Sequence, residues 1–197
     1  MAIKGVLFDF DGTLTRPGAI DFPAIKEELG CPRNHSILEY LETLDPESRA
    51  RGMAILVERE DRASALSRPN RGAEACLRAL RERGIPVGIL TRNSLNSVMR
   101  ALENFDGVKA AHFAAIITRE SSLPKPHPHG VYQAAGKMGI GPHELLVAGD
   151  FRFDVMAGKA AGSRTALLLN GGVSPMDPHD PEPDYTLHSL EALLDLL

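Results

Sequence analysis

The apolar residues of this chain fall into two kinds of segment. Short apolar runs without alternating polar positions, each ending on polar or glycine residues, occur at 3–8, 85–90, 114–118, 145–148 and 165–169. Such runs are typical of parallel strands buried on both faces. Apolar residues at helical spacing occur at 73–83, 94–104, 128–138, 153–161 and 187–197. Strands that alternate with helices predict an α/β fold with a doubly wound parallel sheet.

Residues 16–71 interrupt this alternation. They contain no strand-like run, but 22–29, 36–44 and 47–66 carry apolar residues at helical spacing. We therefore expect a small α-helical cap at 16–71, inserted after the first strand into a core made of 1–15 and 72–197. The segment SRPNRG at 67–72 is expected to be a hinge, and the Pro- and Asp-rich stretch 173–184 a surface loop.

Composition narrows the choice of partners. The chain has 197 residues, of which 43% are hydrophobic, so a core forms without disulfides or a structural metal, and Cys31 and Cys76 are expected to be reduced. A net charge of −4 argues against nucleic acid or anionic lipid as a partner. No signal region and no membrane-spanning apolar run are present, which favours a cytoplasmic location with no membrane partner. The sequence does not indicate an oligomeric state.

Polar motifs follow four of the predicted strands. They are DFDGT from Asp9, TRN from Thr91, PKPHP around Lys125 and GDFRFD around Asp150. In a doubly wound sheet the functional site lies outside the carboxyl ends of the strands, so these motifs are expected to meet. Several carboxylates around one point suit a hard divalent cation, and Mg²⁺ fits best. A cation would also offset the repulsion between Asp9 and Asp11.

Each motif supplies a group suited to phosphoryl transfer. Asp9, kept ionised beside a cation, is a candidate nucleophile, and Asp11 could pass a proton to a departing alkoxide. The Thr91 hydroxyl and the Arg92 backbone amide are placed to bind the transferring oxygens, and Lys125 supplies a positive charge. This set fits an anionic tetrahedral reactant and an aspartyl phosphate intermediate.

The fourth motif completes the expected metal site. Asp150 follows a strand directly, and Asp154, four residues later, lies on the same side of a following helical turn. His127 and His129 stand beside prolines at a helix start and are expected to be loop polar groups rather than ligands.

Taken together, DFDGTLT, LTRN, KPHP and GDFRFD, in this order and each behind an apolar strand, resemble the haloacid dehalogenase superfamily. The ending PDYTLHSLEALLDLL resembles the closing strand and helix of its phosphoglycolate phosphatase-like members. The resemblance implies a Rossmann-like core with a cap, and a Mg²⁺-dependent phosphatase acting on a small phosphorylated metabolite. An acid at Asp11 favours phosphate chemistry over carbon–halogen cleavage, because members that cleave carbon–halogen bonds lack it.

The resemblance also implies roles for single residues. Asp9 would be the nucleophile and a Mg²⁺ ligand, and Asp11 the acid/base and a ligand through its backbone carbonyl. Asp150 would bind Mg²⁺. Asp154 would support the ion without binding it directly, either through the residues that do bind it or through a water molecule. Thr91 and Lys125 would hold the phosphate.

The sequence departs from the family pattern at two positions. Phe151 stands where a small hydroxyl residue is common, and Arg92 separates Thr91 from Asn93, where many relatives have the asparagine directly. The cap is short, which suggests an open site. Four residues at its junctions are candidates for substrate contacts, namely Arg16, Arg68, Asn70 and Arg71.

Three other functions compete with a phosphatase. A phosphomutase or phosphotransferase of the same superfamily would need a cap that keeps water out, and this insertion is short. A signalling receiver would carry its phosphorylated aspartate after a later strand and would have no cap. A non-catalytic metal-binding regulatory protein would not need the full set of catalytic groups. The sequence leaves the physiological substrate open.

Overall fold

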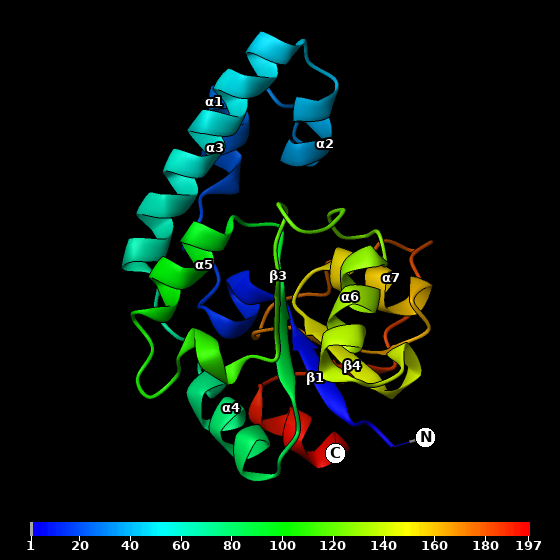
Figure 1. Cartoon of the computed structure of the whole chain (residues 1–197). Helices are drawn as coiled ribbons and strands as arrows, with labels where there is room; N and C mark the ends of the chain where they lie inside the picture. The colour runs from blue at the N-terminus through cyan, green and yellow to red at the C-terminus, as the bar shows by residue number, and fades with distance from the viewer. Residues whose placement is uncertain (1) are drawn as a thin grey trace.

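The centre of the molecule is a six-stranded sheet in which all neighbouring strands are parallel (Figure 1). The computed structural model describes residues 2–197. The strands are β1 (Gly5–Phe8), β2 (Val87–Leu90), β3 (Ala115–Ile117), β4 (Leu145–Gly149), β5 (Arg164–Leu168) and β6 (Tyr185–Leu187), in the order β3-β2-β1-β4-β5-β6. The order changes direction at β1, so the residue after β1 sits at the switch point of the sheet, where α/β proteins bind ligands. The predicted α/β fold is confirmed.

Helices cover both faces of the sheet. One face packs on α4 (Ala73–Glu82), α5 (Leu95–Leu102) and the final turns η4 (Glu191–Leu196), and the other on α6 (His129–Met138) and α7 (Arg152–Ala160). Short turns η2 (Ala110–His112) and η3 (Pro142–Glu144) precede β3 and β4. Along β1, Val6 and Phe8 join the first core and Leu7 the second. Burial on both faces explains why the strand runs contain no alternating polar residue.

Glycine and serine residues close the ends of three core helices. Gly84 and Gly139, just beyond α4 and α6, both have φ of 68°, the left-handed conformation that closes a helix. Ser94 caps α5, because its Oγ accepts a hydrogen bond from the Ser97 N–H at 3.1 Å.

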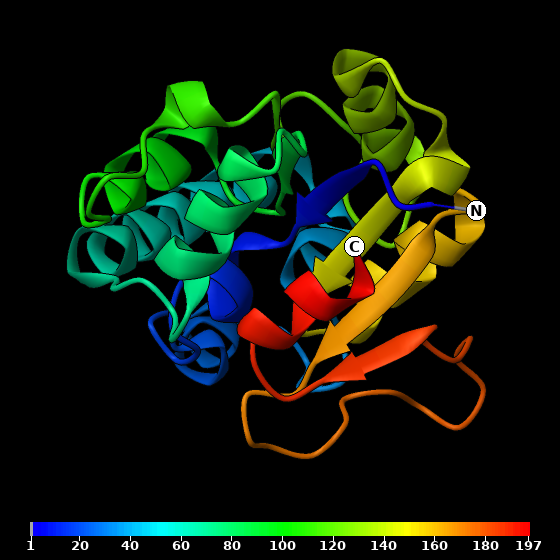
Figure 2. The same ribbon diagram turned by 90° about the horizontal axis from the view of Figure 1, so that it is seen from below.

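The predicted helix at 187–197 is wrong at its start. Leu187 ends strand β6, opposite Leu168 of β5, and only η4 is helical (Figure 2). Leu187, Leu190 and Leu193 are all buried. Their spacing of three residues imitates one face of a helix, although the first belongs to a strand and the others to a turn that packs on the sheet. The closing strand implied by the family resemblance is present.

The insertion contains the expected three helices, α1 (Phe22–Leu29), α2 (Ile37–Glu42) and α3 (Pro46–Leu66). They stand together beyond the carboxyl ends of the strands (Figure 1). They bury a small core of their own, made of Ile20, Ile25, Cys31, Ile37, Leu41 and Leu56. We propose that residues 16–71 act as a cap on the α/β core.

The two ends of the insertion are joined by hydrogen bonds. The Arg16 N–H donates to the Arg68 carbonyl at 2.9 Å, and the Asn70 N–H donates to the Leu14 carbonyl at 2.8 Å. The hinge expected at 67–72 is thus paired with the chain that leaves the first motif, and its mobility stays a prediction.

Cys31 and Cys76 are buried and unpaired, as expected of structural thiols. Burial raises the pKa of the Cys76 thiol to about 12. Among the helices of residues 2–197, none combines the length and apolar character needed to cross a bilayer.

Candidate active site

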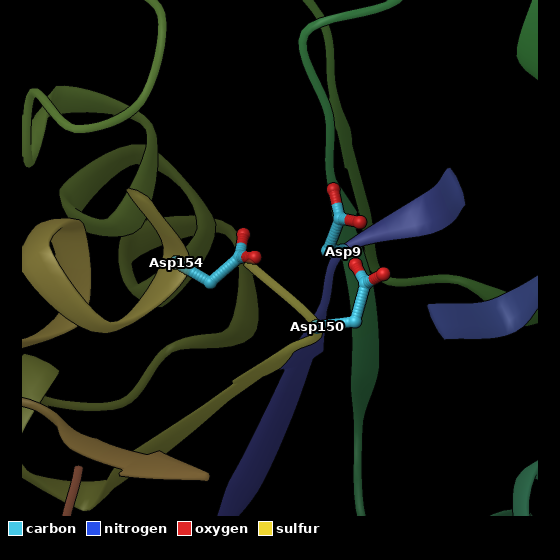
Figure 3. Close-up of side chains that lie close together, drawn as sticks. All are labelled: Asp9, Asp150 and Asp154. Carbon is cyan, nitrogen blue, oxygen red and sulfur yellow. The ribbon is translucent and has the colours of Figure 1, made fainter. Parts of the chain in front are cut away.

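Three carboxylates converge at the carboxyl end of the sheet (Figure 3). Asp9 follows β1, Asp150 follows the neighbouring β4, and Asp154 lies in the first turn of α7. One oxygen of each lies within 4.8 Å of the others. Their approach depends on two glycines, because a Cβ on Gly12, which has φ of 79°, would collide with Asp150, and a Cβ on Gly149 would collide with Asp154.

Lys125 is the cation within this cluster. Its side chain is 4% exposed, and its Nζ donates to a carboxylate oxygen of Asp9 and, at 2.5 Å, to Oδ1 of Asp154. Burial alone would lower the pKa of Lys125, but the attraction of Asp154 and Asp9 outweighs burial and raises it above its usual value. The ammonium group therefore stays charged and links the third motif to the first and fourth.

One ammonium group does not balance three carboxylates. Burial, followed by the charge of Asp154, raises the pKa of Asp150 to about 7. Burial also raises the pKa of Asp9, against the attraction of Lys125 and with added repulsion from Asp154 and Asp150. Uncompensated carboxylate oxygens gathered at one point match the oxygen ligands that Mg²⁺ prefers, and a divalent cation would restore the ionised forms. The residues present thus fit the expected metal.

Asp11 has different surroundings from the other acids. Its carboxylate accepts a hydrogen bond from the side-chain amide of Asn93 and another from Thr15 Oγ1 at 3.4 Å. It is not among the converging carboxylates of Asp9, Asp150 and Asp154. Burial raises the pKa of Asp11, partly opposed by the Asn93 hydrogen bond. A carboxyl group that holds its proton more firmly than usual is suited to proton transfer.

Thr91 and Arg92 follow β2 and reach the same region. Thr91 is buried, and its Oγ1 accepts a hydrogen bond from the Asn93 N–H at 3.1 Å. The Arg92 guanidinium donates to the Lys125 carbonyl at 2.7 Å and to Glu39 at 2.5 Å. The side chain of Arg92 is therefore already bound to other residues of the protein. The prediction that Arg92 binds the substrate concerns its backbone amide.

A cleft of about 530 Å³ opens between the insertion and the carboxyl ends of the strands. Its core side contains Asp9, Asp11, Thr91, Arg92, Asn93, Lys125, Asp150, Phe151, Phe153 and Asp154. Its insertion side is mostly apolar and contains Ile20, Phe22, Ile37, Leu38 and Leu56, with Arg16, Lys26 and Glu60 as charged members. A cleft of this size is in the range of small-molecule sites.

The four residues predicted as possible substrate contacts at the junctions of the insertion differ in position. Arg16 lines the cleft, whereas Arg68, Asn70 and Arg71 do not. The Asn70 amide donates instead to the carbonyl of Thr13 at 2.9 Å, and so supports the first motif.

The two histidines of the third motif stay away from the site. Within residues 2–197, neither His127 nor His129 belongs to the carboxylate cluster or to the lining of the cleft. His129 begins α6, and its Nδ1 lies 3.2 Å from Ser122 Oγ of the preceding loop.

A buried ion pair near the cleft has no counterpart in the sequence analysis. Glu60 of α3 is 3% exposed, and Arg119 donates to both of its carboxylate oxygens at 2.7 Å. Arg119 also donates to the Arg92 carbonyl at 3.1 Å. In the sequence, Glu60 is one of many charged residues of its helix and gives no sign of being buried. The structure alone shows that it attaches α3 next to the second motif.

Comparisons with known proteins agree with this geometry. A family model described as haloacid dehalogenase-like hydrolase matches residues 3–162. An uncharacterised hydrolase of Saccharomyces cerevisiae is 31% identical over 200 residues, covering 99% of this chain and 91% of the yeast protein. A pyrophosphatase of Halalkalibacterium halodurans is 27% identical, covering 100% and 98%. The crystal structure of a predicted phosphoglycolate phosphatase from Haemophilus somnus superimposes with a TM-score of 0.75 at 20% identity, covering 98% and 97%. The chain belongs to the haloacid dehalogenase-like hydrolases.

Proposed function

We propose that this hydrolase is a Mg²⁺-dependent phosphatase that cleaves a small phosphomonoester with Asp9 as the nucleophile. The observation that carries the proposal is the contact of Asp9 with Lys125 inside a carboxylate cluster at the base of the cleft. A phosphate dianion placed between the Lys125 ammonium and a cation would have its charge balanced on both sides.

The protein's own residues account for both chemical steps. A carboxylate oxygen of Asp9 attacks phosphorus, and the bond from phosphorus to the leaving oxygen breaks as Asp11 gives that oxygen its proton. Water then attacks the phosphorus of the aspartyl phosphate, Asp11 takes a proton from the water, and the Asp9–phosphorus bond breaks. Lys125, the Thr91 hydroxyl and the Arg92 backbone amide hold the phosphate oxygens.

Asp9, Asp150 and the Asp11 backbone carbonyl would hold the cation. When bound, Mg²⁺ neutralises phosphate charge and fixes the orientation of the phosphate. Asp154 has a separate task, because its carboxylate accepts a hydrogen bond from the Lys125 Nζ at 2.5 Å and so directs the ammonium group toward Asp9. We therefore propose that Asp154 positions Lys125 and supports the cation from behind or through water.

The cleft also supports a proposal about the substrate. The names of the relatives point to small phosphorylated compounds. The insertion side of this cleft is mostly apolar. One phenyl ring on each side of the cleft stays partly exposed, Phe22 of the insertion at 45% and Phe151 of the core at 46%. Apolar surface left open in a cleft is suited to an apolar group of a ligand. We propose a phosphorylated metabolite whose leaving group has an apolar face.

Two simple esters test this substrate class. Benzyl phosphate and ethyl phosphate carry the same charge and both release a primary alcohol, so they differ mainly in apolar surface. We expect kcat/KM, measured by inorganic phosphate release with Mg²⁺, to be at least about 10-fold higher for benzyl phosphate. Loss of release on chelation would support the metal requirement.

Variants locate the source of this preference. Phe151→Ser is expected to reduce the ratio of the two kcat/KM values by about 5-fold or more. Tyr132→Ser is the matched control, since Tyr132 is 47% exposed but lies outside the cleft lining. Equal kcat/KM values for both esters in the unmodified protein would contradict the apolar leaving group. Phosphate transfer to added glycerol in place of release would favour the phosphotransferase alternative.

A further inference from the structure

We propose that Arg92 is a positioning residue that couples α2 of the insertion to the loop carrying Lys125. The proposal rests on the function proposed above, in which Lys125 holds the phosphate. It predicts that the placement of Lys125 depends on where α2 sits.

Three elements meet at the Arg92 guanidinium. Its Nη2 donates to Glu39 Oε2 of α2 at 2.5 Å, and its Nη1 donates to the Lys125 carbonyl at 2.7 Å. Its central carbon lies 5.1 Å from the centre of the Phe153 ring of α7, a cation–π distance. One planar group therefore bridges the insertion, the third motif and the fourth motif. Lysine has no fork of donors with which to replace it.

The backbone of Arg92 is held separately from its side chain. Arg119 donates to the Arg92 carbonyl at 3.1 Å and forms the buried ion pair with Glu60 of α3. The two side chains are 10% and 3% exposed, and separating them would leave a buried charge without its partner, so the pair keeps α3 next to the core at this point. The base of the insertion is thereby fixed next to the second motif.

The contact between Arg92 and Glu39 is of a weaker kind. The two side chains are 20% and 46% exposed, and an exposed ion pair adds little to stability. The contact instead fixes the orientation of the guanidinium. With α2 in place, Glu39 accepts a hydrogen bond from Nη2 while Nη1 donates to the Lys125 carbonyl. If α2 moves away, the guanidinium loses this support, and the hydrogen bond from Nη1 to the Lys125 carbonyl is no longer held in one orientation. We infer that the phosphate site is fully assembled only when α2 is seated.

The chain provides a matched pair of variants. Glu39→Gln removes the charge that faces Arg92. Glu42→Gln is the control, because Glu42 lies on the same helix and its ion pair, at 2.7 Å, is with Arg49 of the insertion rather than with a residue of the core. With whichever of benzyl and ethyl phosphate is cleaved faster, we expect Glu39→Gln to lower kcat by about 10-fold, since small misplacements of catalytic groups are costly. Glu42→Gln is expected to leave kcat within about 2-fold.

A double variant separates coupling from general damage. Arg92→Met should lower kcat by about 30-fold, and Arg92→Lys should recover part of that loss. Adding Glu39→Gln to Arg92→Met should change kcat no further, because the two residues act as one unit. Thermal unfolding is expected to be similar in the Glu39→Gln and Glu42→Gln proteins.

Two results would overturn the proposal while the unmodified enzyme remains active. One is an equal kcat for the Glu39→Gln and Glu42→Gln variants. The other is a double variant whose loss is the product of the two single losses. An unmodified enzyme that releases no phosphate from either ester would overturn the proposed function itself, and the proposal with it.

Discussion

Replacing Asp9 with asparagine is expected to reduce phosphate release by at least about 1,000-fold while the fold is kept. The amide is a poor nucleophile, and no other acid occupies the end of β1 next to Lys125. The substitution also removes one of three converging carboxylates, which lessens their repulsion in the absence of metal. The measurement is phosphate release from benzyl phosphate at saturating Mg²⁺.

Circular dichroism and thermal unfolding provide the control for Asp9→Asn. The expected result is a native spectrum and an unfolding midpoint within a few degrees of the unmodified protein. An Asp9→Asn protein that turns over at the original rate would eliminate the nucleophile assignment. A protein that fails to fold would be compared with Asp11→Asn, which keeps Asp9 and is expected to lose activity without loss of the metal.

Replacing Asp150 with asparagine is expected to weaken the apparent affinity for Mg²⁺ by at least about 100-fold. Asp150 lies beside Asp9 and Asp154 and, within residues 2–197, forms no ion pair, so it is the acid of the three most available to a metal. Phosphate release as a function of Mg²⁺ concentration, with direct calorimetric titration, gives the affinity. An unchanged titration would place the metal elsewhere.

The same variant tests the proton linkage of the site. In the metal-free protein the pKa of Asp150 is about 7, because burial and then the charge of Asp154 favour the protonated form. A cation must displace that proton, so the affinity for Mg²⁺ should rise as pH increases from 6 to 8. Asp150→Asn should show a flatter dependence, since one of the displaced protons is missing. A dependence as steep as that of the unmodified protein would assign the proton to another group.

The positions of several site residues could be predicted from where the strands end. Asp9 and Asp150 come directly after apolar runs that are buried on both faces, so their place at the carboxyl edge of the sheet could be predicted before their partners were known. Asp154 follows from the periodicity of one helical turn. These positions depend on local pattern and on one rule of topology.

The contacts that tune the site could not be predicted in this way. The pairs Asn93–Asp11, Arg119–Glu60 and Arg92–Glu39 join residues 82, 59 and 53 positions apart. Each contains a polar residue that, in its own segment, is indistinguishable from a solvated one. The last two pairs depend on how the insertion packs on the core, and the first depends on how the loops after β1 and β2 lie side by side. The helix predicted to begin at Leu187 is wrong for a related reason. Leu187 pairs with Leu168 of β5, a distant contact that its helical spacing in the sequence does not reveal.

Oxygen exchange into inorganic phosphate tests the central claim without a known substrate. Phosphate labelled with oxygen-18 is incubated with the Mg²⁺-loaded protein in ordinary water, and loss of label is followed by phosphorus NMR. Because phosphate is the common product, an aspartyl phosphate formed in reverse would release one phosphate oxygen as water at each cycle. The account predicts loss of label with the unmodified protein and none with Asp9→Asn. Hydrolysis of phosphomonoesters without exchange, or exchange that persists in Asp9→Asn, would contradict it.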